Sequence, residues 1–309
     1  MNRAAVVIGI PTYRRPLLLA RLLDSLAPEI DGQDVLIVVG DNEAGTRAAE
    51  VVRDSGLDAV CVPVPRPGIS EVRNELVRAA TRERPDWRHL IMLDDDGLVT
   101  PGWFAHLMAG VDRFGADVTA GPVLGELPAG ASLLARNSVY AGRRRHPSGP
   151  VAMLNGAQNI CISRAAVDAI GDPWFPVHLG TAGGEDHFFF REVLDQGGTL
   201  AWCDEAAVTE PTPASRLATG VILRRAFNSN VVAAQTDRAF HGRAFVVKHV
   251  IVGTGWAARN TAAGLVRRDP DKFAATAIDL VALGGRLVGL VRNTPRRPGT
   301  PVSDRRSQT

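Results

Sequence analysis

Hydrophobic residues in the first third of the chain form short continuous runs, and longer segments of mixed polarity separate them. The runs at 5–10, 35–39, 59–64, 90–93 and 117–121 predict five strands. The segments between them, at 17–27, 46–55, 70–83 and 102–114, predict four helices. Unbroken apolar strands are expected where helices cover both faces of a sheet. The alternation therefore predicts an α/β fold with a mostly parallel sheet.

The pattern changes after about residue 122, where glycine and proline become frequent. We expect shorter elements there: strands at 158–163 and 199–203, and helices at 164–170 and 187–196. Beyond Pro213 the chain is helical in pattern, and its last residues are rich in proline, arginine and serine. These changes divide the chain into an α/β domain over 1–230, a helical region over 231–294 and a disordered tail over 295–309.

Three adjacent carboxylates, Asp94, Asp95 and Asp96, follow the apolar run at 90–93 and precede Gly97. The end of a strand is where open α/β sheets place their ligands. Neighbouring carboxylates repel one another, and hard oxygen ligands suit Mg²⁺ or Mn²⁺, which commonly also hold substrate phosphates. The triplet therefore indicates a metal–diphosphate site. The alternative is a solvated acidic turn.

Composition narrows the possible classes of function. Of the 309 residues, 45% are hydrophobic and 22% charged, and the net charge of +2 argues against a polycationic nucleic-acid-binding protein. The three cysteines are far apart and form no CxxC pair, which argues against a zinc site or a disulfide framework. No secretory core precedes the first strand. We therefore expect a cytoplasmic protein.

Four further motifs lie beside predicted strand ends or helix starts. They are Pro11-Thr12-Tyr13-Arg14 after the first strand, Asp41 after the second, Gly68 with Arg73 and Asn74 around the start of a helix, and Glu185-Asp186 before another. Each has a purely structural alternative: a turn, a helix cap, a surface arginine or acids at a helix N-terminus. Together with the Asp triplet they make five motifs in one chain.

In this order, over about residues 5–230, the five motifs resemble those of the inverting GT-A-fold glycosyltransferases of family 2. The resemblance implies a GT-A-like, Rossmann-related α/β fold, with a mostly parallel central sheet flanked by helices and a helical C-terminal appendage. It also implies a nucleotide-sugar-binding half over 1–121 and an acceptor-binding half over 122–230. A nucleoside-diphosphate sugar would be the donor and a hydroxyl group the acceptor.

The resemblance also implies roles for single residues. The donor-binding residues would be Pro11, Thr12, Tyr13, Arg14, Asp41, Gly68, Arg73, Asn74, Asp94 and Asp95. Asp96 and Asp94 would bind Mn²⁺ or Mg²⁺, which stabilises the departing diphosphate as a Lewis acid. Asp186 would act as general base on the acceptor hydroxyl, and Glu185 would orient acceptor or sugar.

One position departs from the family pattern. Many relatives carry a histidine after the strand at 199–203, where it completes the metal site, and this chain has Glu210 at about that position. Its carboxylate is also a suitable ligand for a hard cation. Glu210 is thus a third candidate metal ligand, or else metal binding rests on the Asp triplet alone.

Three other classes of function have some support in the sequence. Gly253-Thr254-Gly255 begins a G-x-G-x-x-A pattern, but too little chain follows for a dinucleotide-binding domain. A sugar nucleotidyltransferase would open with a glycine-rich loop and a lysine, which the segment after the first strand lacks. A non-catalytic nucleotide-sugar-binding protein would not need the intact carboxylates. The last two remain alternatives.

The helical region over 248–292 is apolar, with scattered arginines. Its apolar run at 273–283 is interrupted by Asp279 and is shorter than the roughly twenty residues of a spanning helix. Basic residues flank it at Arg286, Arg292, Arg296 and Arg297. This composition fits an interfacial helix on the inner face of a membrane, or a core or homodimer helix with a basic face. Both interpretations stay open.

Overall fold

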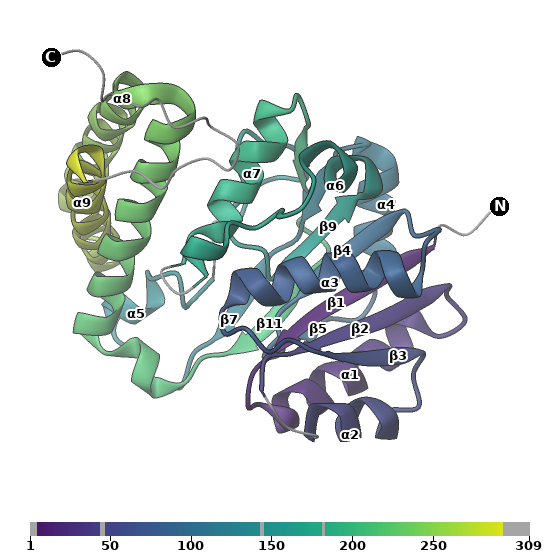
Figure 1. Ribbon diagram of the computed structural model, residues 1–309. Helices are drawn as coiled ribbons and strands as arrows, with labels where there is room; N and C mark the ends of the chain where they lie inside the picture. Colours follow the sequence, from purple (N-terminus) through teal and green to yellow (C-terminus); the bar gives the residue numbers. More distant parts are fainter. Residues whose placement is uncertain (1–4, 44–46, 143–144, 181–182, 293–309) are drawn as a thin grey trace, which may run out of the picture.

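The computed structural model describes residues 5–43, 47–142, 145–180 and 183–292, so the predicted tail at 295–309, with Arg296 and Arg297, lies outside the described residues. An eight-stranded sheet forms the centre, in the order β3-β2-β1-β4-β9-β6-β10-β8 (Figure 1). Its strands are β1 (Val6–Thr12), β2 (Val35–Asp41), β3 (Ala59–Pro63), β4 (His89–Leu93), β6 (Val118–Ala120), β8 (Gly149–Pro150), β9 (Asn159–Ser163) and β10 (Leu200–Trp202).

The pairing of the strands confirms a mostly parallel sheet. β1 is parallel to β2 and β4, β2 is parallel to β3, and β10 is parallel to β6. β9 runs antiparallel to both β4 and β6, and β8 runs antiparallel to β10. Only β8 and β9 among these eight described strands therefore point the opposite way.

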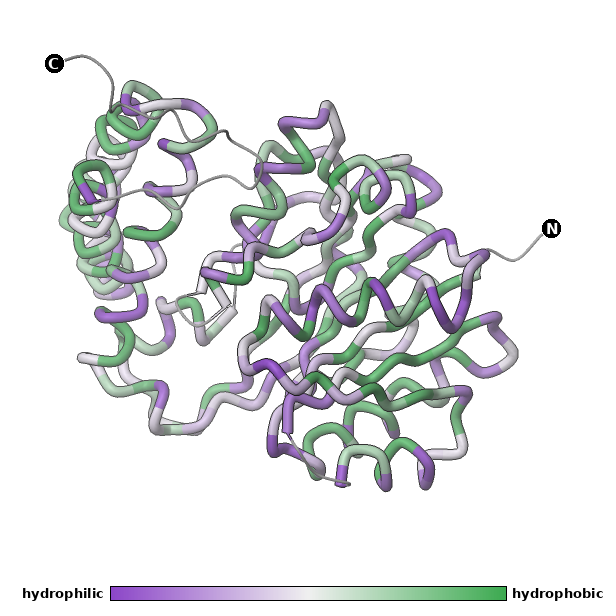
Figure 2. The backbone as a smooth tube through the Cα atoms, viewed as in Figure 1, coloured by the Kyte–Doolittle hydropathy of each residue, from purple (hydrophilic) through white to green (hydrophobic). Residues whose placement is uncertain are grey.

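Helices cover both faces of this sheet. The helices of the α/β body are α1 (Pro16–Ile30), α2 (Arg47–Asp54), α3 (Ile69–Glu83), α4 (Trp103–Phe114), α6 (Arg164–Ile170) and α7 (Glu185–Asp195). Apolar residues of α1, α2 and α4 share one core cluster, and those of α3, α6 and α7 share the other. Successive residues of β1 alternate between the clusters, with Val7 in one and Val6 and Ile8 in the other. This two-sided burial explains why the strands are continuous apolar runs, which are green in Figure 2.

A second, three-stranded sheet was not predicted. It has the order β5-β11-β7, formed by β5 (Leu98–Val99), β7 (Val123–Glu126) and β11 (Val208–Pro211). Asn159 joins it to the main sheet: its Nδ2 donates to the carbonyls of Pro122 (3.2 Å) and Ala206 (2.8 Å), and its Oδ1 accepts from Trp103 Nε1 (3.0 Å). Strands of two to four residues are too short to show a hydrophobic period. Short helical turns are α5 (Leu133–Arg136), η1 (Val177–Leu179) and η2 (Ala214–Leu217).

The chain ends in a helical bundle beside the α/β body, formed by α8 (Thr219–Arg267) and α9 (Pro270–Val291) (Figure 1). Gly242, with φ 80° and ψ 177°, breaks α8 into two segments, 219–241 and 243–267. The predicted boundary at residue 230 falls inside the first segment, and the G-x-G pattern at Gly253 lies inside the second. The helical C-terminal appendage is therefore confirmed, although its first helix already begins at Thr219.

Glycines bring α9 against both segments of α8. A Cβ at Gly253 would lie 2.7 Å from the Leu283 side chain, so the second segment contacts α9 closely there. A Cβ at Gly285 would lie 2.3 Å from the carbonyl oxygen of Phe227, and one at Gly289 would lie 2.4 Å from that of Val231. The residue numbers of these contacts increase in the same direction along both helices, from Phe227 to Val231 and from Gly285 to Gly289. The first segment therefore runs parallel to α9. The three helical segments therefore form one closely packed unit.

Among the described residues, α9 is the one helix long and apolar enough to cross a membrane, with 22 residues and a mean hydropathy of 1.6. The prediction that this stretch is too short was wrong, because the helix continues beyond the run at 273–283. Its contacts favour packing in the bundle: Arg286 donates to Asn230 and Asp237. A spanning α9 would bring Arg286 and Asp279 into lipid, at about 2.5–3.5 kcal/mol for each charge near the bilayer centre.

Candidate active site

A cavity of about 610 Å³ opens at the carboxyl ends of β1 and β4. Its size is in the usual range for small-molecule sites, and its place matches where open α/β sheets bind ligands. Lining residues from the first 121 residues include Pro11, Thr12, Tyr13, Arg15, Asn42, Gly68, Asp94, Asp95 and Asp96. Lining residues from 122–230 include Val139, Tyr140, Glu210, Thr212, Arg216 and Arg225. Residues from distant parts of the chain therefore face one space.

The Asp triplet forms the turn between β4 and β5, where Gly97 N donates to the carbonyl of Asp94 (3.2 Å). Asp95 is buried: Thr12 Oγ1 donates to it at 2.7 Å and Arg15 Nη1 at 3.1 Å. Burial raises the pKa of Asp95, while the bonds from Thr12 and Arg15 act in the opposite direction. Asp95 therefore fastens the acidic turn to the loop after β1, rather than lying in solvent.

Arg15 is a site residue that the sequence analysis missed. Its Nη1 contacts both Asp95 and Asp96, the latter at 3.0 Å. The sequence-based prediction was the neighbouring Arg14. In the structure the Arg14 side chain is 65% exposed and pairs with Glu43 at 3.0 Å. Arg14 has a φ of 57°, a left-handed conformation that is uncommon for arginine. No pattern in the sequence separates two adjacent arginines, so the local backbone decides which one reaches the site.

Arg73 joins the acidic turn to the Glu185-Asp186 motif. From within α3 its Nη1 donates to Glu185 Oε1 at 2.5 Å, and its Nη2 to Asp94 Oδ1 at 3.3 Å. Arg73 and Glu185 are both buried, and Arg73 Nε and Glu185 Oε2 have no hydrogen-bond partner among the described residues. Burial opposes the charge on Arg73, but Glu185 and Asp94 outweigh it and raise its pKa. Burial also raises the pKa of Glu185 against the effect of Arg73.

Asp186 lies in the first turn of α7, after Gly184, and is the more exposed of the two acids. Its Oδ1 accepts from His187 N at 2.7 Å. A carboxylate at a helix N-terminus is stabilised by the helix dipole. Neither Glu185 nor Asp186 is among the residues that line the cavity; Arg73 bonds to Glu185 and to Asp94, which does line it. The structure thus brings the motif close to the acidic turn without placing it in the cavity wall.

The bundle holds the first turn of α7 in place. Asp237 of α8, 1% exposed, accepts from His187 Nε2 (2.9 Å) and Arg191 Nε (2.9 Å) of α7, and from Arg286 Nη1 (3.0 Å) of α9. Burial opposes the charge on Asp237, but His187, Arg191 and Arg286 outweigh it and hold its pKa well below the usual range. A buried carboxylate therefore ties the α7 helix to both bundle helices.

We expect Asp237→Asn to lower the free energy of unfolding at pH 7 by about 1.5–3 kcal/mol, the range for hydrogen bonds to a charged group. Since the pKa of Asp237 is lower in the folded state, its stabilisation is present above about pH 4 and is lost as the pH falls below it. Urea titrations at several pH values should therefore show a shallower loss of stability in acid for the variant. Asp168→Asn, at an exposed ion pair, is the control. Parallel curves for wild type and Asp237→Asn would contradict the assignment.

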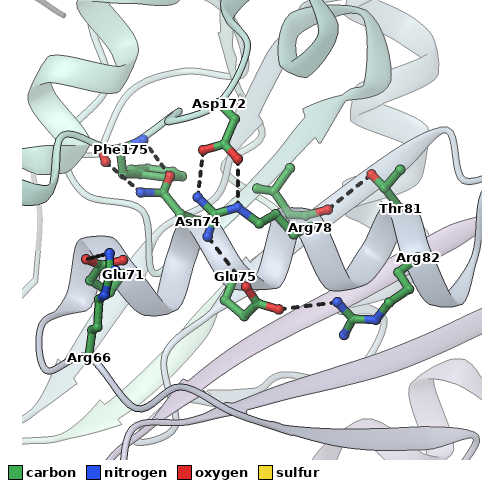
Figure 3. Close-up of polar contacts among 10 residues, drawn as sticks. Arg66, Glu71, Asn74, Glu75, Arg78, Thr81, Arg82, Asp172 and Phe175 are labelled. Atoms are coloured by element: carbon green, nitrogen blue, oxygen red, sulfur yellow. Dashed lines mark hydrogen bonds and ion pairs between the residues drawn. The ribbon is translucent and has the colours of Figure 1, made fainter.

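Two predicted donor-binding residues serve the framework instead of the cavity wall. Asn74 is fully buried: its Nδ2 donates to the carbonyl of Phe175 (2.8 Å) and its Oδ1 accepts from Phe175 N (2.9 Å), as Figure 3 shows. Arg78, on the same helix, makes two bonds to Asp172 (2.7 and 2.6 Å).

Asp41 is buried at the end of β2 and accepts from Glu43 N (2.9 Å). Burial raises the pKa of Asp41.

Asn42, which the sequence analysis did not select, lines the cavity in place of Asp41. Its Nδ2 donates to the carbonyls of Val64 and Arg66 at 2.8 and 2.7 Å, and its Oδ1 accepts from Gly68 N at 3.0 Å. Gly68 has a φ of 125°, which favours glycine, and it caps α3. Asn42 and Gly68 therefore shape the loop that carries the chain from β3 to the cavity and α3.

The three predicted metal ligands, Asp94, Asp96 and Glu210, all line the cavity, and each contacts an arginine. Arg216 Nη1 donates to Glu210 Oε1 at 2.9 Å, and its Nη2 is 3.7 Å from Asp96 Oδ2. Asp96 and Glu210 thus converge on one positive group, and their oxygens are the ligand type that Mg²⁺ and Mn²⁺ prefer. However, no three acidic, histidine or cysteine side chains among the described residues are arranged to hold an ion. A cation fits the ligand chemistry, provided that Arg216 moves.

The chain is similar to known proteins in sequence. A sequence model described as Glycosyl transferase family 2 matches residues 7–168 of the 309. The Succinoglycan biosynthesis protein ExoM of Rhizobium meliloti (strain 1021) is 30% identical over 232 residues, which are 72% of each chain.

Solved structures share the fold. The mannosyltransferase PcManGT from Pyrobaculum calidifontis, in complex with GDP-Man and Mn²⁺, has a TM-score of 0.56 at 15% identity, over 93% of this chain and 88% of its own. S. aureus TarS has a TM-score of 0.50 at 18% identity, over 75% of this chain and 41% of its own, so this chain spans less than half of TarS. The five motifs, the sheet that gathers them and these matches lead to one conclusion: the chain belongs to glycosyl transferase family 2.

Proposed function

We propose that this glycosyltransferase moves a sugar from a nucleoside-diphosphate donor to a hydroxyl acceptor with inversion at the anomeric carbon. The observation that carries the proposal is the cavity at the strand ends, whose Asp94 bonds to Arg73, which in turn bonds to Glu185, the neighbour of Asp186. A donor diphosphate needs positive and polar groups, and an attacking hydroxyl needs a base. The cavity wall supplies arginines and polar groups for the diphosphate, and the candidate base belongs to a motif outside that wall that Arg73 joins to Asp94.

We assign the role of general base, which deprotonates the acceptor hydroxyl, to Asp186. Glu185 is buried, and its Oε1 accepts a bond from Arg73, so this carboxylate is already engaged away from an incoming acceptor. Asp186 is more exposed and lies at the N-terminus of α7, where negative charge is favourable. Asp186 therefore takes the proton from the acceptor hydroxyl as the new bond forms. Glu185 keeps Arg73 and the first turn of α7 in place.

The donor would occupy the cavity between the loop after β1 and the acidic turn. Tyr13 is half exposed at the cavity wall, where it offers a ring to a base. Arg15 and Arg216 are the cavity arginines closest to the acidic turn, so they, and not Arg14, are the candidates for the diphosphate. This assignment replaces the one made from the sequence for Arg14.

Asp94, Asp96 and Glu210 would hold Mn²⁺ or Mg²⁺. When bound, such a cation supplies Lewis-acid stabilisation of the negative charge on the departing diphosphate. Two observations support this part of the proposal: Asp96 and Glu210 contact the same guanidinium, and the structurally similar mannosyltransferase is in complex with GDP-Man and Mn²⁺. The ExoM relative is a succinoglycan biosynthesis protein, which supports a role in carbohydrate biosynthesis for this chain.

A thermal-shift panel of nucleotide sugars, with and without Mn²⁺, tests donor binding. A donor at 100 times its dissociation constant stabilises the folded state by about 2.7 kcal/mol, which is a shift of several degrees. We expect at least one donor to raise the melting temperature, and more so with Mn²⁺. If no nucleotide sugar stabilises the protein, the cavity is not a donor site.

Asp96→Asn should weaken donor binding in the presence of Mn²⁺ by at least about tenfold, since an amide is a poorer ligand for a hard cation. Isothermal titration of the donor, with Mn²⁺ or with a chelator, measures the effect, which should vanish in the chelator. Asp54→Asn, at a side chain that is 76% exposed on α2, is the matched control. Equal Mn²⁺-dependent affinity in wild type and Asp96→Asn would mean that the triplet is an acidic turn without a metal.

A further inference from the structure

The second segment of α8, at 243–267, buries a narrow stripe of its surface. Its fully buried residues are Val246, Ala257 and Gly264. Large apolar side chains on its remaining surface are exposed: Val247, Ile251, Val252, Trp256, Leu265 and Val266. Ile251 is 67% exposed and Trp256 48%, although either would be buried in an ordinary core helix. Figure 2 shows these bundle helices at the edge of the molecule, away from the central sheet.

The charges on this segment all have one sign. Between residues 243 and 268 the sequence has no aspartate or glutamate. The exposed charged side chains are Arg243, Lys248, Arg259, Arg267 and Arg268. The Arg259 guanidinium lies 3.9 Å from the centre of the Trp256 ring, so a cation and an aromatic side chain share one exposed place. We call these eleven residues together the basic–apolar face.

The neighbouring α9 extends the apolar part of this surface. Phe273, Leu280, Leu287 and Val291 are exposed on it. The sequence analysis counted Arg286 among the flanking cations, but its side chain points inward to Asp237 and Asn230. The cations beside the exposed apolar side chains are therefore those of α8 and its C-cap, together with the exposed Arg292 that follows α9. Two acidic side chains of α9 are also accessible: Asp279 is exposed, and the side chain of Asp271, near the start of the helix, is half exposed.

We propose that the basic–apolar face docks on an anionic lipid surface, with the helix lying in the plane of the interface. Exposed apolar side chains interleaved with lysine and arginine, with no acids, are the composition that binds such surfaces. A second copy of this chain is the competing occupant. A two-fold contact would place this face against itself, so that its five basic side chains would meet one another while none of its eleven residues supplies a carboxylate. Charge complementarity therefore selects the lipid.

Docking in this way would hold the active site near the membrane. Arg225, in the first segment of α8, lines the cavity. Asp237, in the same segment, accepts a hydrogen bond from His187 of α7. This first segment packs against the same α9 as the second segment. The proposal does not depend on glycosyl transfer, because lipid binding is measured without donor or acceptor.

The test is flotation of the full chain with two kinds of vesicle: phosphatidylcholine alone, and phosphatidylcholine with about a third phosphatidylglycerol. We expect binding to the anionic vesicles only. Ile251→Ser/Trp256→Ser should reduce it at least tenfold by removing buried apolar area. Lys248→Glu/Arg259→Glu should reduce it more than about 25-fold, since each basic residue near an anionic surface raises affinity about fivefold. Leu17→Ser, at an exposed leucine on α1, is the control and should bind like wild type.

Salt and oligomeric state complete the test. Raising the salt from about 0.1 to 1 M shortens the Debye length from about 10 to 3 Å and should release the wild type. Circular dichroism should show all variants folded, because the substituted side chains are exposed. Equal binding to neutral and anionic vesicles, or none to either, would overturn the proposal. So would a dimer, measured by light scattering, that dissociates in the Ile251→Ser/Trp256→Ser variant.

Discussion

Asp186→Asn should lower the rate of sugar transfer by about 10²–10⁴-fold, the usual loss when a general base is removed, and leave donor affinity unchanged. The amide has nearly the shape of the carboxylate and its oxygen can still accept the bond from His187 N, so the first turn of α7 is kept. It cannot take the proton of the acceptor hydroxyl. Single-turnover rates, with donor affinity from titration calorimetry, separate these two effects.

Two comparisons make this result specific. Asp195→Asn, at the other end of α7, makes the same chemical change and should transfer sugar like wild type. Glu185→Gln should reduce transfer less than Asp186→Asn, because the amide oxygen still accepts a bond from Arg73. If Glu185→Gln is inactive and Asp186→Asn is active, the base is Glu185. If both variants are active, the pair is only the start of a helix.

Arg73→Met should lower the free energy of unfolding by about 3–5 kcal/mol, the range for breaking a buried ion pair by removing one partner. It leaves Glu185 buried beside Asp94 without a counter-charge. Denaturant titration at pH 7 measures the loss. Arg82→Met, at a half-exposed arginine on the same helix, is the control and should change stability by less than about 1 kcal/mol.

A double variant separates the structural role of Arg73 from its role in the reaction. Replacing a whole buried ion pair with apolar side chains is often neutral or stabilising. Arg73→Met/Glu185→Leu should therefore regain most of the stability lost in Arg73→Met, and should still lack transfer activity. A double variant that is both stable and active would show that Arg73 and Glu185 only fill space. Wild-type stability in Arg73→Met alone would contradict the burial of the pair.

Much of the fold could be predicted because a strand that is buried on both faces of the sheet is a continuous run of apolar residues in the sequence. The strands β1, β2 and β4 of the first half are continuous apolar runs with helices between them. Their order in the sheet, with β4 beside β1 and not beside β3, is a property of the structure that the runs do not give. The second sheet escaped prediction because β5, β7 and β11 have two to four residues each. Their pairing depends on contacts across about a hundred positions, such as Val208 with Val99 and Val123.

The site was predictable where chemistry alone limits the choice of residue. A carboxylate triplet at a strand end has few structural explanations, and the structure places it in the cavity wall. Local geometry decided the other cases. Asp41 and Asn42 are adjacent, yet Asn42 lines the cavity. Asn74 follows Arg73 by one residue, which on a helix turns its side chain about 100° toward Phe175.

Long-range partners also could not be predicted. Asp237 is one aspartate in a long helical pattern, and its three partners come from α7 and α9. Arg216 lies in a proline-containing connection, and its position between Asp96 and Glu210 depends on the second sheet. The sequence offers no periodicity or spacing for either residue. Both positions follow from how the bundle and the α/β body pack together.

The proposed reaction is transfer from a nucleoside-diphosphate sugar with help from a divalent cation. Release of nucleoside diphosphate from a panel of nucleotide sugars, measured with Mn²⁺ and with EDTA, tests it most directly. We predict that at least one donor releases its diphosphate, that EDTA suppresses the release, and that Asp96→Asn loses it. Release that is unchanged by EDTA, or no release from any donor that binds, would contradict the account.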